Sequence, residues 1–266
     1  KSTYRESSDR FEPVVGLSES GFGDLSSSVL FLSKEETDQH EVGGDYSQSL
    51  AAGTWKIIGL RRYEHRSPGN QFNEIVRLAD DYSFQSQTES RETETVIRTL
   101  FTTQSAEKHT LVFSFEGVKN ILKTSTLYAE DVGEGYAFFD VAGSDVDVNE
   151  DRAEVGVQYS RPLSGGWSLQ SLVATEYSKI SVEGEEGDQQ RSDSFVRYKG
   201  FIALNGTLSE KTTVRTRLEK TVGQLSFSDF ASSKNVNEGT NDGGNTQLVP
   251  DQTWRAEFAY EHTFGE

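Results

Sequence analysis

The sequence contains no cysteine and no methionine, and it has only four prolines and four histidines among 266 residues. The lack of cysteine excludes disulfides, zinc–thiolate centres and thiol catalysis within this chain. No window holds the 18 or more consecutive apolar residues that a membrane-spanning helix needs. The histidines show no H-E-x-x-H or paired spacing, so the sequence predicts no zinc site; they are His40, His65, His109 and His262.

Catalytic signatures are equally scarce. The sequence has no G-x-S-x-G elbow, no Walker loop and no dinucleotide fingerprint. The segment "EDVGEGYAFFD" offers Asp131 and Glu134 as a carboxylate pair, but such pairs are common in acidic loops. We therefore expect no enzymatic activity and no cofactor.

The formal charge of −17 argues against nucleic acid as a partner, because that partner requires a basic surface. The acidity either keeps loops solvated or attracts a cationic or metal-bearing ligand. Hydrophobic residues make up only 33% of the chain. Such a chain is either soluble with a thin core, or it places apolar residues at every second position of strands. The second arrangement is typical of a barrel with a lipid-facing exterior and a wet lumen.

Alternation dominates wherever the sequence is informative. In residues 212–222, Val214, Leu218 and Val222 share one face, while Arg215, Arg217 and Glu219 share the other. The closing segment repeats the pattern, because its aromatic residues alternate with charged ones. Its apolar face holds Trp254, Ala256, Phe258, Tyr260 and Phe264, and its polar face holds Arg255, Glu257 and Glu261. We expect the first face to contact lipid and the second to face a lumen.

The connections between these runs differ in length. Short turns are predicted near Gly21, Ala52, Ala106, Ser164 and Glu210, a short connection at 35–41, and long polar connections at 67–91, 129–145, 182–192 and 229–253. An alternation of short turns and long loops is typical of outer-membrane barrels. The fold class predicted is all-β: an antiparallel transmembrane β-barrel with short periplasmic turns, long extracellular loops and about eleven strands in this chain.

Two tryptophans follow glycines that end short turns. Trp55 and Trp167 are predicted to form an interfacial aromatic belt at one level of the membrane. The alternative interpretation is a pair of buried tryptophans beneath hairpin ends of a soluble sheet.

One segment resembles the start of a calcium loop. Asp145, Asp147, Asn149 and Asp151 follow a D-x-D-x-N-x-D pattern, but the positions that an EF-hand reserves for Gly and Glu hold Glu150 and Gly156. The segment is thus a weak calcium candidate; the alternative is the polar end of a strand.

Loops on a rigid scaffold commonly carry binding residues. The acidic and aromatic segments supply the candidate ligand contacts, namely Asp80, Asp81, Tyr82, Tyr128 and Tyr136. On the presumed lumen face, Arg215, Arg217 and Glu219 either line a transport path or form cross-strand ion pairs, and the second interpretation is preferred.

The closing segment "GGNTQLVPDQTWRAEFAYE" resembles a loop-to-strand motif of TonB-dependent outer-membrane receptors. The matching positions are Asn245, Leu248, Pro250, Asp251, Thr253 and Glu257, with Asp251 in place of the commoner Glu. The segments "YSRPLSGGWSLQSLVATEYS" and "GTWKIIGLRRYEHRSPGNQF" are similar to barrel strands of one proteobacterial branch. The resemblance covers roughly residues 43–264.

This resemblance implies a location in the bacterial outer membrane and import of a scarce nutrient such as a siderophore or an oligosaccharide. Receptors of this family close 22 strands around a plug domain, and residues 1–266 contain neither a plug nor a TonB box. We therefore expect residues 1–266 to be part of the barrel domain of a longer chain. The implied partners are outer-membrane lipid, a plug domain, the remaining strands, the TonB energy-coupling complex and a small-molecule or oligomeric nutrient.

Two other functions remain open. One is a non-transporting structural or adhesive outer-membrane barrel, and the other is a soluble all-β sandwich enzyme. Importers of siderophores, vitamins, oligosaccharides and peptides share one barrel, so the resemblance leaves the substrate undetermined.

Overall fold

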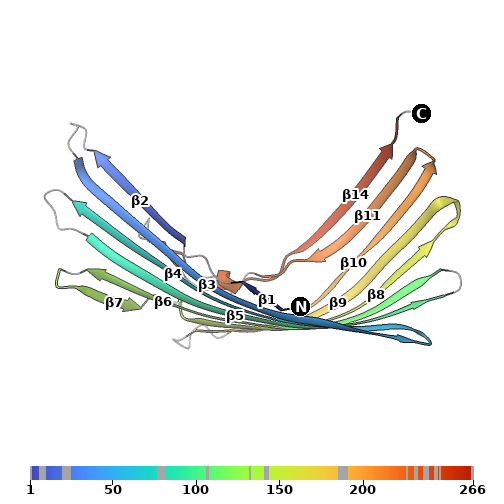
Figure 1. The fold of residues 1–266 in the computed structure, drawn as a ribbon, viewed down its shortest axis with the longest axis horizontal. Helices are drawn as coiled ribbons and strands as arrows, with labels where there is room; N and C mark the ends of the chain where they lie inside the picture. The colour runs from blue at the N-terminus through green and yellow to red at the C-terminus, as the bar shows by residue number, and fades with distance from the viewer. Residues whose placement is uncertain are drawn as a thin grey trace.

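The computed structural model shows one large antiparallel sheet, curved into an open trough (Figure 1). It describes residues 2–5, 10–19, 25–76, 82–105, 108–131, 133–140, 144–184, 191–225, 227–230, 233–235, 240–242, 245 and 247–264. Among these residues, no helix is both long and apolar enough to cross a membrane.

Strands make up nearly all of the regular structure. In chain order, the elements are β1 (Ser2–Arg5), β2 (Arg10–Glu19), β3 (Leu25–Leu50), β4 (Gly53–Val76), β5 (Tyr82–Gln104), β6 (Thr110–Asp131), β7 (Tyr136–Asp140), β8 (Val146–Pro162), the 3-10 turn η1 (Ser164–Gly166), β9 (Trp167–Gly184), β10 (Arg191–Ser209), β11 (Thr212–Val222), the 3-10 turn η2 (Phe227–Phe230), β12 (Ser233–Asn235), β13 (Thr240–Asp242) and β14 (Gln252–His262).

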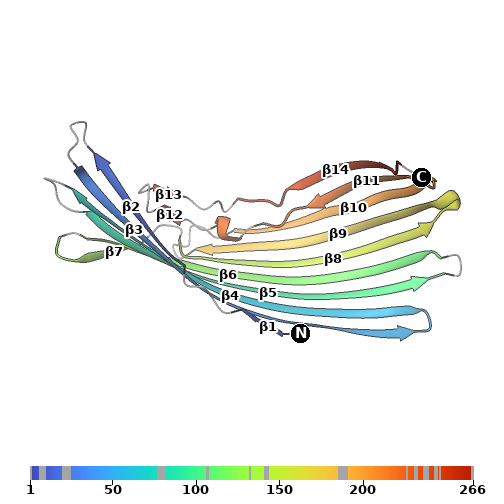
Figure 2. The same cartoon turned by 45° about the horizontal axis from the view of Figure 1, so that its top comes forward.

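Sequence neighbours are also spatial neighbours in this sheet. The strand order is β1-β3-β4-β5-β6-β8-β9-β10-β11-β14, with β2 pairing with β3 and β7 pairing with β6 (Figure 2). The short strands β12 and β13 pair with each other in the connection between β11 and β14. The predicted all-β antiparallel architecture is confirmed, and the sheet is open rather than closed.

Short turns gather at one end of the sheet. Residues 51–52, 105–109, 163–166 and 210–211 join β3 to β4, β5 to β6, β8 to β9 and β10 to β11, as predicted. At the other end lie the connection between β6 and β8 that contains β7, and the connection from β11 to β14.

The prediction of a short connection at residues 35–41 is wrong. These residues lie inside β3, which pairs continuously with β4 from Ser27↔Val76 to Leu50↔Gly53. Consequently, β2 and β3 meet at the end of the sheet opposite to the short turns, because Glu19 pairs with Leu25. The run "SKEETDQHEV" has few apolar residues, so its pairing depends on backbone hydrogen bonds that no hydrophobic pattern reports.

The predicted long loop at 67–91 is also mostly strand. β4 extends to Val76 and β5 begins at Tyr82, and the ladder continues there through Phe72↔Phe84. The stacked rings of Phe72 and Phe84, whose centroids lie 4.7 Å apart, stabilise this distal part of the hairpin.

The sheet is a single layer. Its accessible surface of 17290 Å² far exceeds the roughly 11,600 Å² expected of a compact monomer of 29.6 kDa. A soluble sandwich requires two packed sheets, whereas the described residues form one twelve-stranded sheet and a two-stranded hairpin. The fold therefore does not support the sandwich alternative.

The main buried cluster lies where η2 packs onto the sheet. Figure 1 shows η2 on the concave side of the trough. Phe227 and Phe230 pack there against residues of β6, β8 and β9, namely Leu122, Val146, Val148, Ile180 and Val182. The side of the sheet that carries Leu122 and Val148 is thus the concave face.

Candidate functional site

The convex face carries an apolar band in the half of the sheet nearest the short turns. One row across the strands reads Trp55, Phe101, Phe113, Val157, Val173, Gly200, Lys220 and Trp254. Large apolar side chains of this face are widely exposed, among them Tyr46, Ile97, Phe115, Val155, Val173, Tyr177, Val196, Tyr198, Ile202, Trp254, Phe258 and Tyr260. We call this surface the apolar band. Its extent exceeds the few hundred Å² of apolar patch that a soluble monomer usually exposes.

Both tryptophans predicted to form a belt lie on this face. Each is close to the short turn that precedes its strand. Trp55 is 37% exposed and its indole N–H donates a hydrogen bond to Thr99 Oγ1 at 2.6 Å. Trp167 is half-buried, and its ring lies over Gly206, its pairing partner on β10. The two tryptophans therefore share a face and an end of the sheet, while their membrane role stays a prediction.

Charged pairs lie on the convex face beyond the apolar band. Lys119 Nζ donates to Asp151 Oδ1 at 3.2 Å, and Lys123 forms an ion pair with Asp147. Asp147, Asn149 and Asp151 stand at alternate positions of β8, which places Asp147 and Asp151 about 13 Å apart along the strand. Asp145 lies just before β8, where its carboxylate accepts a hydrogen bond from the backbone N–H of Thr126 at 3.3 Å. Within the described residues no group of three or more candidate ligands could hold a metal ion.

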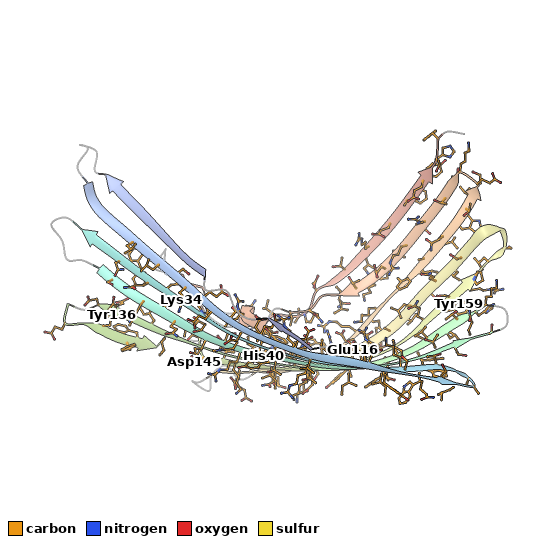
Figure 3. All side chains as sticks on the ribbon, in the orientation of Figure 1. Lys34, His40, Glu116, Tyr136, Asp145 and Tyr159 are labelled. Atoms are coloured by element: carbon orange, nitrogen blue, oxygen red, sulfur yellow. The ribbon has the colours of Figure 1, made fainter. Side chains whose placement is uncertain are left out.

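The concave face is lined by charged side chains from β4 to β14. Figure 3 shows how densely side chains cover both faces, from Tyr136 near the long connections to Tyr159 near the short turns. Ion pairs on the concave face include Lys56–Asp45, Arg98–Glu116, Arg152–Glu116, Lys199–Glu154, Lys199–Glu176, Arg217–Glu219, Arg215–Glu261 and Arg255–Glu257. The opposite chemistry of the two faces follows directly from strand alternation.

The predicted polar face of the closing strand lies here too. Register places Arg217 opposite Glu257 and Glu219 opposite Arg255. Arg217 donates to Glu219 along its own strand, with Nη2···Oε1 at 2.7 Å, and Arg255 pairs with Glu257 in the same way. These two pairs therefore run along single strands, whereas the predicted cross-strand ion pair is formed by Arg215 and Glu261, with Nη2···Oε2 at 3.3 Å.

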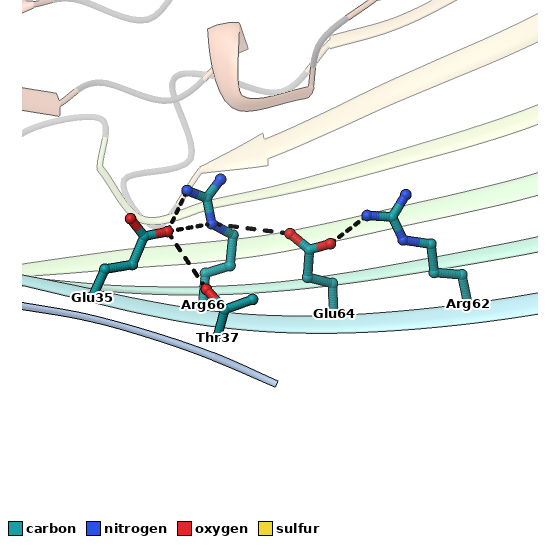
Figure 4. A network of polar contacts seen from close by, with 5 residues as sticks. All are labelled: Glu35, Thr37, Arg62, Glu64 and Arg66. Atoms are coloured by element: carbon teal, nitrogen blue, oxygen red, sulfur yellow. Dashed lines mark hydrogen bonds and ion pairs between the residues drawn. The ribbon is translucent and has the colours of Figure 1, made fainter. Parts of the chain in front are cut away.

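A linked set of charges crosses β3 and β4 beyond the level of the apolar band (Figure 4). Arg66 Nε donates to Glu35 Oε1 at 3.0 Å and lies 3.9 Å from Glu64, which also pairs with Arg62. Thr37 donates to the same Glu35 oxygen at 3.5 Å. The hydrogen bond to Glu35 raises the pKa of the Arg66 guanidinium.

A cavity of about 360 Å³ lies on the concave face beside this set. Its floor comes from β4, β5, β6 and β8, and its roof comes from the segment that follows β11. The lining residues are Arg62, Glu64, Arg66, Ser90, Glu92, Glu94, Asn120, Leu122, Glu150, Gln224, Leu225 and Phe227. We call it the concave cavity.

Glu92 stands in an unfavourable environment within this cavity. Loss of hydration among the strands, and then the neighbouring Glu64 carboxylate, raise the pKa of Glu92 above its usual value of 4.5. Arg62 and Arg66 act in the opposite direction but do not cancel these effects.

The sequence did not single out the concave cavity. Its floor residues occupy alternate positions in "RRYEHR" and "RETE", so strand alternation could place Arg62, Glu64 and Arg66 on one face. Only the register brings Glu92, Asn120 and Glu150 beside them, because Glu64 pairs with Glu92 and Asn120 pairs with Glu150.

The predicted ligand contacts lie toward the end of the long connections. Asp80 and Asp81 fall outside the described residues, and Tyr82 begins β5. Tyr128 is 3% exposed, packs against Phe84 and donates to Glu130 Oε1 at 2.6 Å. Tyr136 is 37% exposed and its hydroxyl lies 2.7 Å from Ser83 Oγ. Tyr136 is thus the more accessible tyrosine of this pair.

The loop-to-strand motif forms the junction between the long connection and β14. Asn245 Oδ1 accepts from the Gln247 backbone N–H at 2.9 Å, and Pro250 is buried directly before the strand. The backbone N–H of Gly223 donates to the Asp251 carbonyl at 3.0 Å. Leu248 packs against the η2 cluster, while Glu257 faces the concave side.

Comparison with known proteins gives only distant structural likenesses. No protein-family model matches the chain, and no curated protein matches it. The ferric yersiniabactin uptake receptor FyuA of Yersinia pestis is similar in structure at 8% identity and a TM-score of 0.42, over 95% of this chain and 46% of that chain. The alcaligin outer membrane receptor FauA of Bordetella pertussis is similar at 10% identity and a TM-score of 0.36, over 97% and 48%.

The chain therefore spans about half the length of either matched structure. At such identities and TM-scores, neither likeness by itself assigns a family or a ligand to this chain.

Proposed function

We propose that residues 1–266 form part of the barrel domain of a TonB-dependent outer-membrane receptor that imports a scarce nutrient, such as a siderophore or an oligosaccharide. The observation that carries the proposal is the division of one curved sheet into an apolar convex face and a charged concave face. Lipid suits the first face and a wet lumen suits the second. The loop-to-strand motif ending in β14 supports the same assignment.

The height of the apolar band fits a bilayer. On β9 the band runs from Trp167 to Tyr177, ten residue steps that span about 33 Å at about 3.3 Å per residue. A strand tilted by about 45° then covers about 23 Å along the membrane normal, close to the roughly 25 Å of an outer-membrane barrel. Trp55 and Trp167 would stand at the periplasmic boundary of this band.

In this assignment the short turns face the periplasm and the long connections face the outside. Strands such as β3 and β4, of 26 and 24 residues, are longer than one crossing requires and would continue beyond the outer leaflet. Tyr82, Tyr128 and Tyr136 belong to this external part, and together with Asp80 and Asp81 they remain the proposed ligand contacts. Import would use a plug domain and the TonB complex as partners.

Fractionation and growth test the proposal together. An epitope-tagged full-length protein should sediment with the outer membrane and should require detergent to stay folded and dispersed. Deletion of its gene, and separately of the TonB gene, should impair growth under iron limitation or on an oligosaccharide as sole carbon source. A protein that stays monomeric and folded without detergent would contradict the membrane assignment; outer-membrane location without a growth defect under any tested nutrient limitation would favour a structural or adhesive barrel.

A further inference from the structure

A level of positive charge borders the apolar band on the side away from the short turns. Followed from those turns, the convex face of β4, β5, β6, β9 and β11 carries only uncharged side chains until one cation appears on each strand. Lys220 is half-buried, with Nζ 5.9 Å from the centroid of the Trp254 ring, and the other four cations are exposed. We call these first charges the cationic collar: Arg61, Arg91, Lys119, Lys179 and Lys220.

The cationic collar departs from the charge of the chain as a whole, which is −17. At its level the convex face of the neighbouring strands adds two carboxylates, Asp38 on β3 and Asp151 on β8. Farther from the short turns, carboxylates prevail on this face, among them Glu36, Glu89, Asp147 and Glu183. On the convex face, an excess of cations over carboxylates therefore marks the boundary of the apolar band.

Three members of the collar have no carboxylate partner. Within the described part of the chain, Arg61, Lys179 and Lys220 form no ion pair. The other two members each hold one exposed carboxylate, at 3.2 Å and 3.3 Å, and such surface pairs are weak. The collar therefore retains positive charge for a partner outside the sheet.

Two lysines of the collar flank one carboxylate. Register places Lys119, Asp151 and Lys179 side by side on β6, β8 and β9. Two strand spacings of about 4.8 Å separate the lysine backbones by about 10 Å, a gap that two long ammonium side chains can close around one phosphate group. Since two ammonium groups exceed the single carboxylate between them, this trio carries a net positive charge.

The height of the collar corresponds to lipid headgroups. Lys179 follows Tyr177, the last residue of the apolar band on β9, at the next position of the same face. On a strand tilted by about 45°, this step adds about 5 Å along the membrane normal. Lysines at such a boundary lay their methylene stems along the apolar surface and extend the ammonium group into the polar layer.

We propose that the cationic collar binds phosphate headgroups of lipids in the outer leaflet, with Lys119 and Lys179 as the central pair. The inference rests on the proposed function, because it takes the apolar band to lie in the membrane with the long connections outside. Lipid would cover the band and the collar together, since one molecule carries both acyl chains and an anionic group. A protein or nucleic-acid partner bound at the collar would leave the adjoining apolar band exposed to water.

Dioleoylphosphatidic acid, whose head is a bare phosphate, is the probe, and dioleoylphosphatidylcholine is the reference lipid. Native mass spectrometry of the full-length protein released from micelles should show that the wild type binds phosphatidic acid in preference to phosphatidylcholine. Lys119→Gln/Lys179→Gln should weaken binding of the first phosphatidic acid by about tenfold or more, because each cation at a lipid surface contributes about fivefold.

Two further double variants separate the collar from folding and from net charge. Lys119→Arg/Lys179→Arg keeps both charges and should bind phosphatidic acid as the wild type does. Arg215→Gln/Arg255→Gln removes two exposed cations from the concave face. It makes the same change in net charge as the lysine-to-glutamine variant and should leave phosphatidic acid binding unchanged.

A wild type without preference for phosphatidic acid, or equal binding by the wild type and Lys119→Gln/Lys179→Gln, would overturn the proposal. Displacement of the lipid by an equal concentration of inorganic phosphate would also overturn it, in favour of a site for free phosphate. Cell fractionation tests the membrane assignment separately. An outer-membrane protein whose glutamine variant binds like the wild type rejects only this inference, whereas recovery in the soluble fraction rejects the proposed function as well.

Discussion

At the residue scale, cross-strand neighbours decide which substitutions the sheet tolerates. Gly206 and Trp167 face each other on β10 and β9, and the indole ring occupies the space above the glycine. A Cβ at Gly206 would lie 2.2 Å from ring atoms of Trp167. The glycine therefore provides the flat surface on which this tryptophan packs.

We expect Gly206→Ala to lower the free energy of unfolding by about 1–3 kcal/mol, because the added methyl displaces a packed ring. Urea unfolding of the full-length protein in micelles, followed by tryptophan fluorescence, measures the change. Gly59→Ala is the control, since it lies on the same face and a Cβ there meets nothing within 4 Å. Equal stability of the two variants would contradict the packing argument.

Glu92 is expected to make stability depend on pH. A raised pKa means that the folded state binds the proton more tightly than the unfolded state. The Glu92 contribution to stability is therefore fully present below the unfolded pKa of 4.5 and is lost as pH rises through the folded pKa. Glu64, Arg62 and Arg66 of β4 and Glu94 of β5 are the charged groups that act on it.

Glu92→Gln should therefore match the wild type near pH 4 and become the more stable protein as pH rises toward neutrality. Unfolding midpoints in urea between pH 4 and pH 8 test this sign. A variant that is less stable at neutral pH would show that a cation of the protein compensates the carboxylate.

At the element scale, η2 attaches the connection from β11 to β14 to the sheet by packing on it. Phe230 is 1% exposed and Phe227 is 8% exposed, and both pack on the strand residues Leu122 and Val148. The junction with β14 is close, because the Asp251 carboxylate lies 1.7 Å from where a Cβ of Gly223 would stand. These contacts keep the roof of the concave cavity in place.

Removing the buried ring should release this connection. Phe230→Ala is expected to cost about 3–5 kcal/mol of packing and to make residues 223–251 more sensitive to protease, while β9 to β11 stay protected. Val249→Ala in the same connection is the control, because Val249 is 56% exposed. Equal cleavage rates for the two variants would show that η2 does not hold the connection.

Element prediction succeeded where side chains alternate clearly and a short turn separates two alternating runs. It failed at residues 35–41 and 67–91, where β3, β4 and β5 continue as paired strands. Polar residues dominate both stretches, so neither face of the strand is distinctly apolar. Pairing there is stabilised by backbone hydrogen bonds and by contacts such as Phe72 with Phe84.

At the scale of the whole molecule, one layer of sheet must satisfy two different environments. The convex face exposes Val173, Val196 and Phe258, and the concave face carries several ion pairs. Exposed apolar surface of this extent is unfavourable in water and favourable against lipid.

Charge on the apolar band should therefore be costly. Val173 is 69% exposed near the middle of the band, and Val173→Arg is expected to lose about 2–4 kcal/mol in a bilayer. Gln170→Arg, at an exposed concave position three residues earlier on β9, should be nearly neutral. Urea unfolding of both variants reconstituted in lipid vesicles measures the difference, and equal stabilities would contradict lipid contact at Val173.

The sequence by itself determined which residues share a face, because side chains of a strand alternate whatever the strand pairs with. It also indicated the short turns and the residues of the junction before β14. Only the tertiary structure decided that η2 covers part of the concave face, and that Glu92, Asn120 and Glu150 meet beside Arg62. The physical reason is that a face is a local property of one strand, whereas neighbours across strands depend on register, and register arises from backbone pairing along the whole ladder.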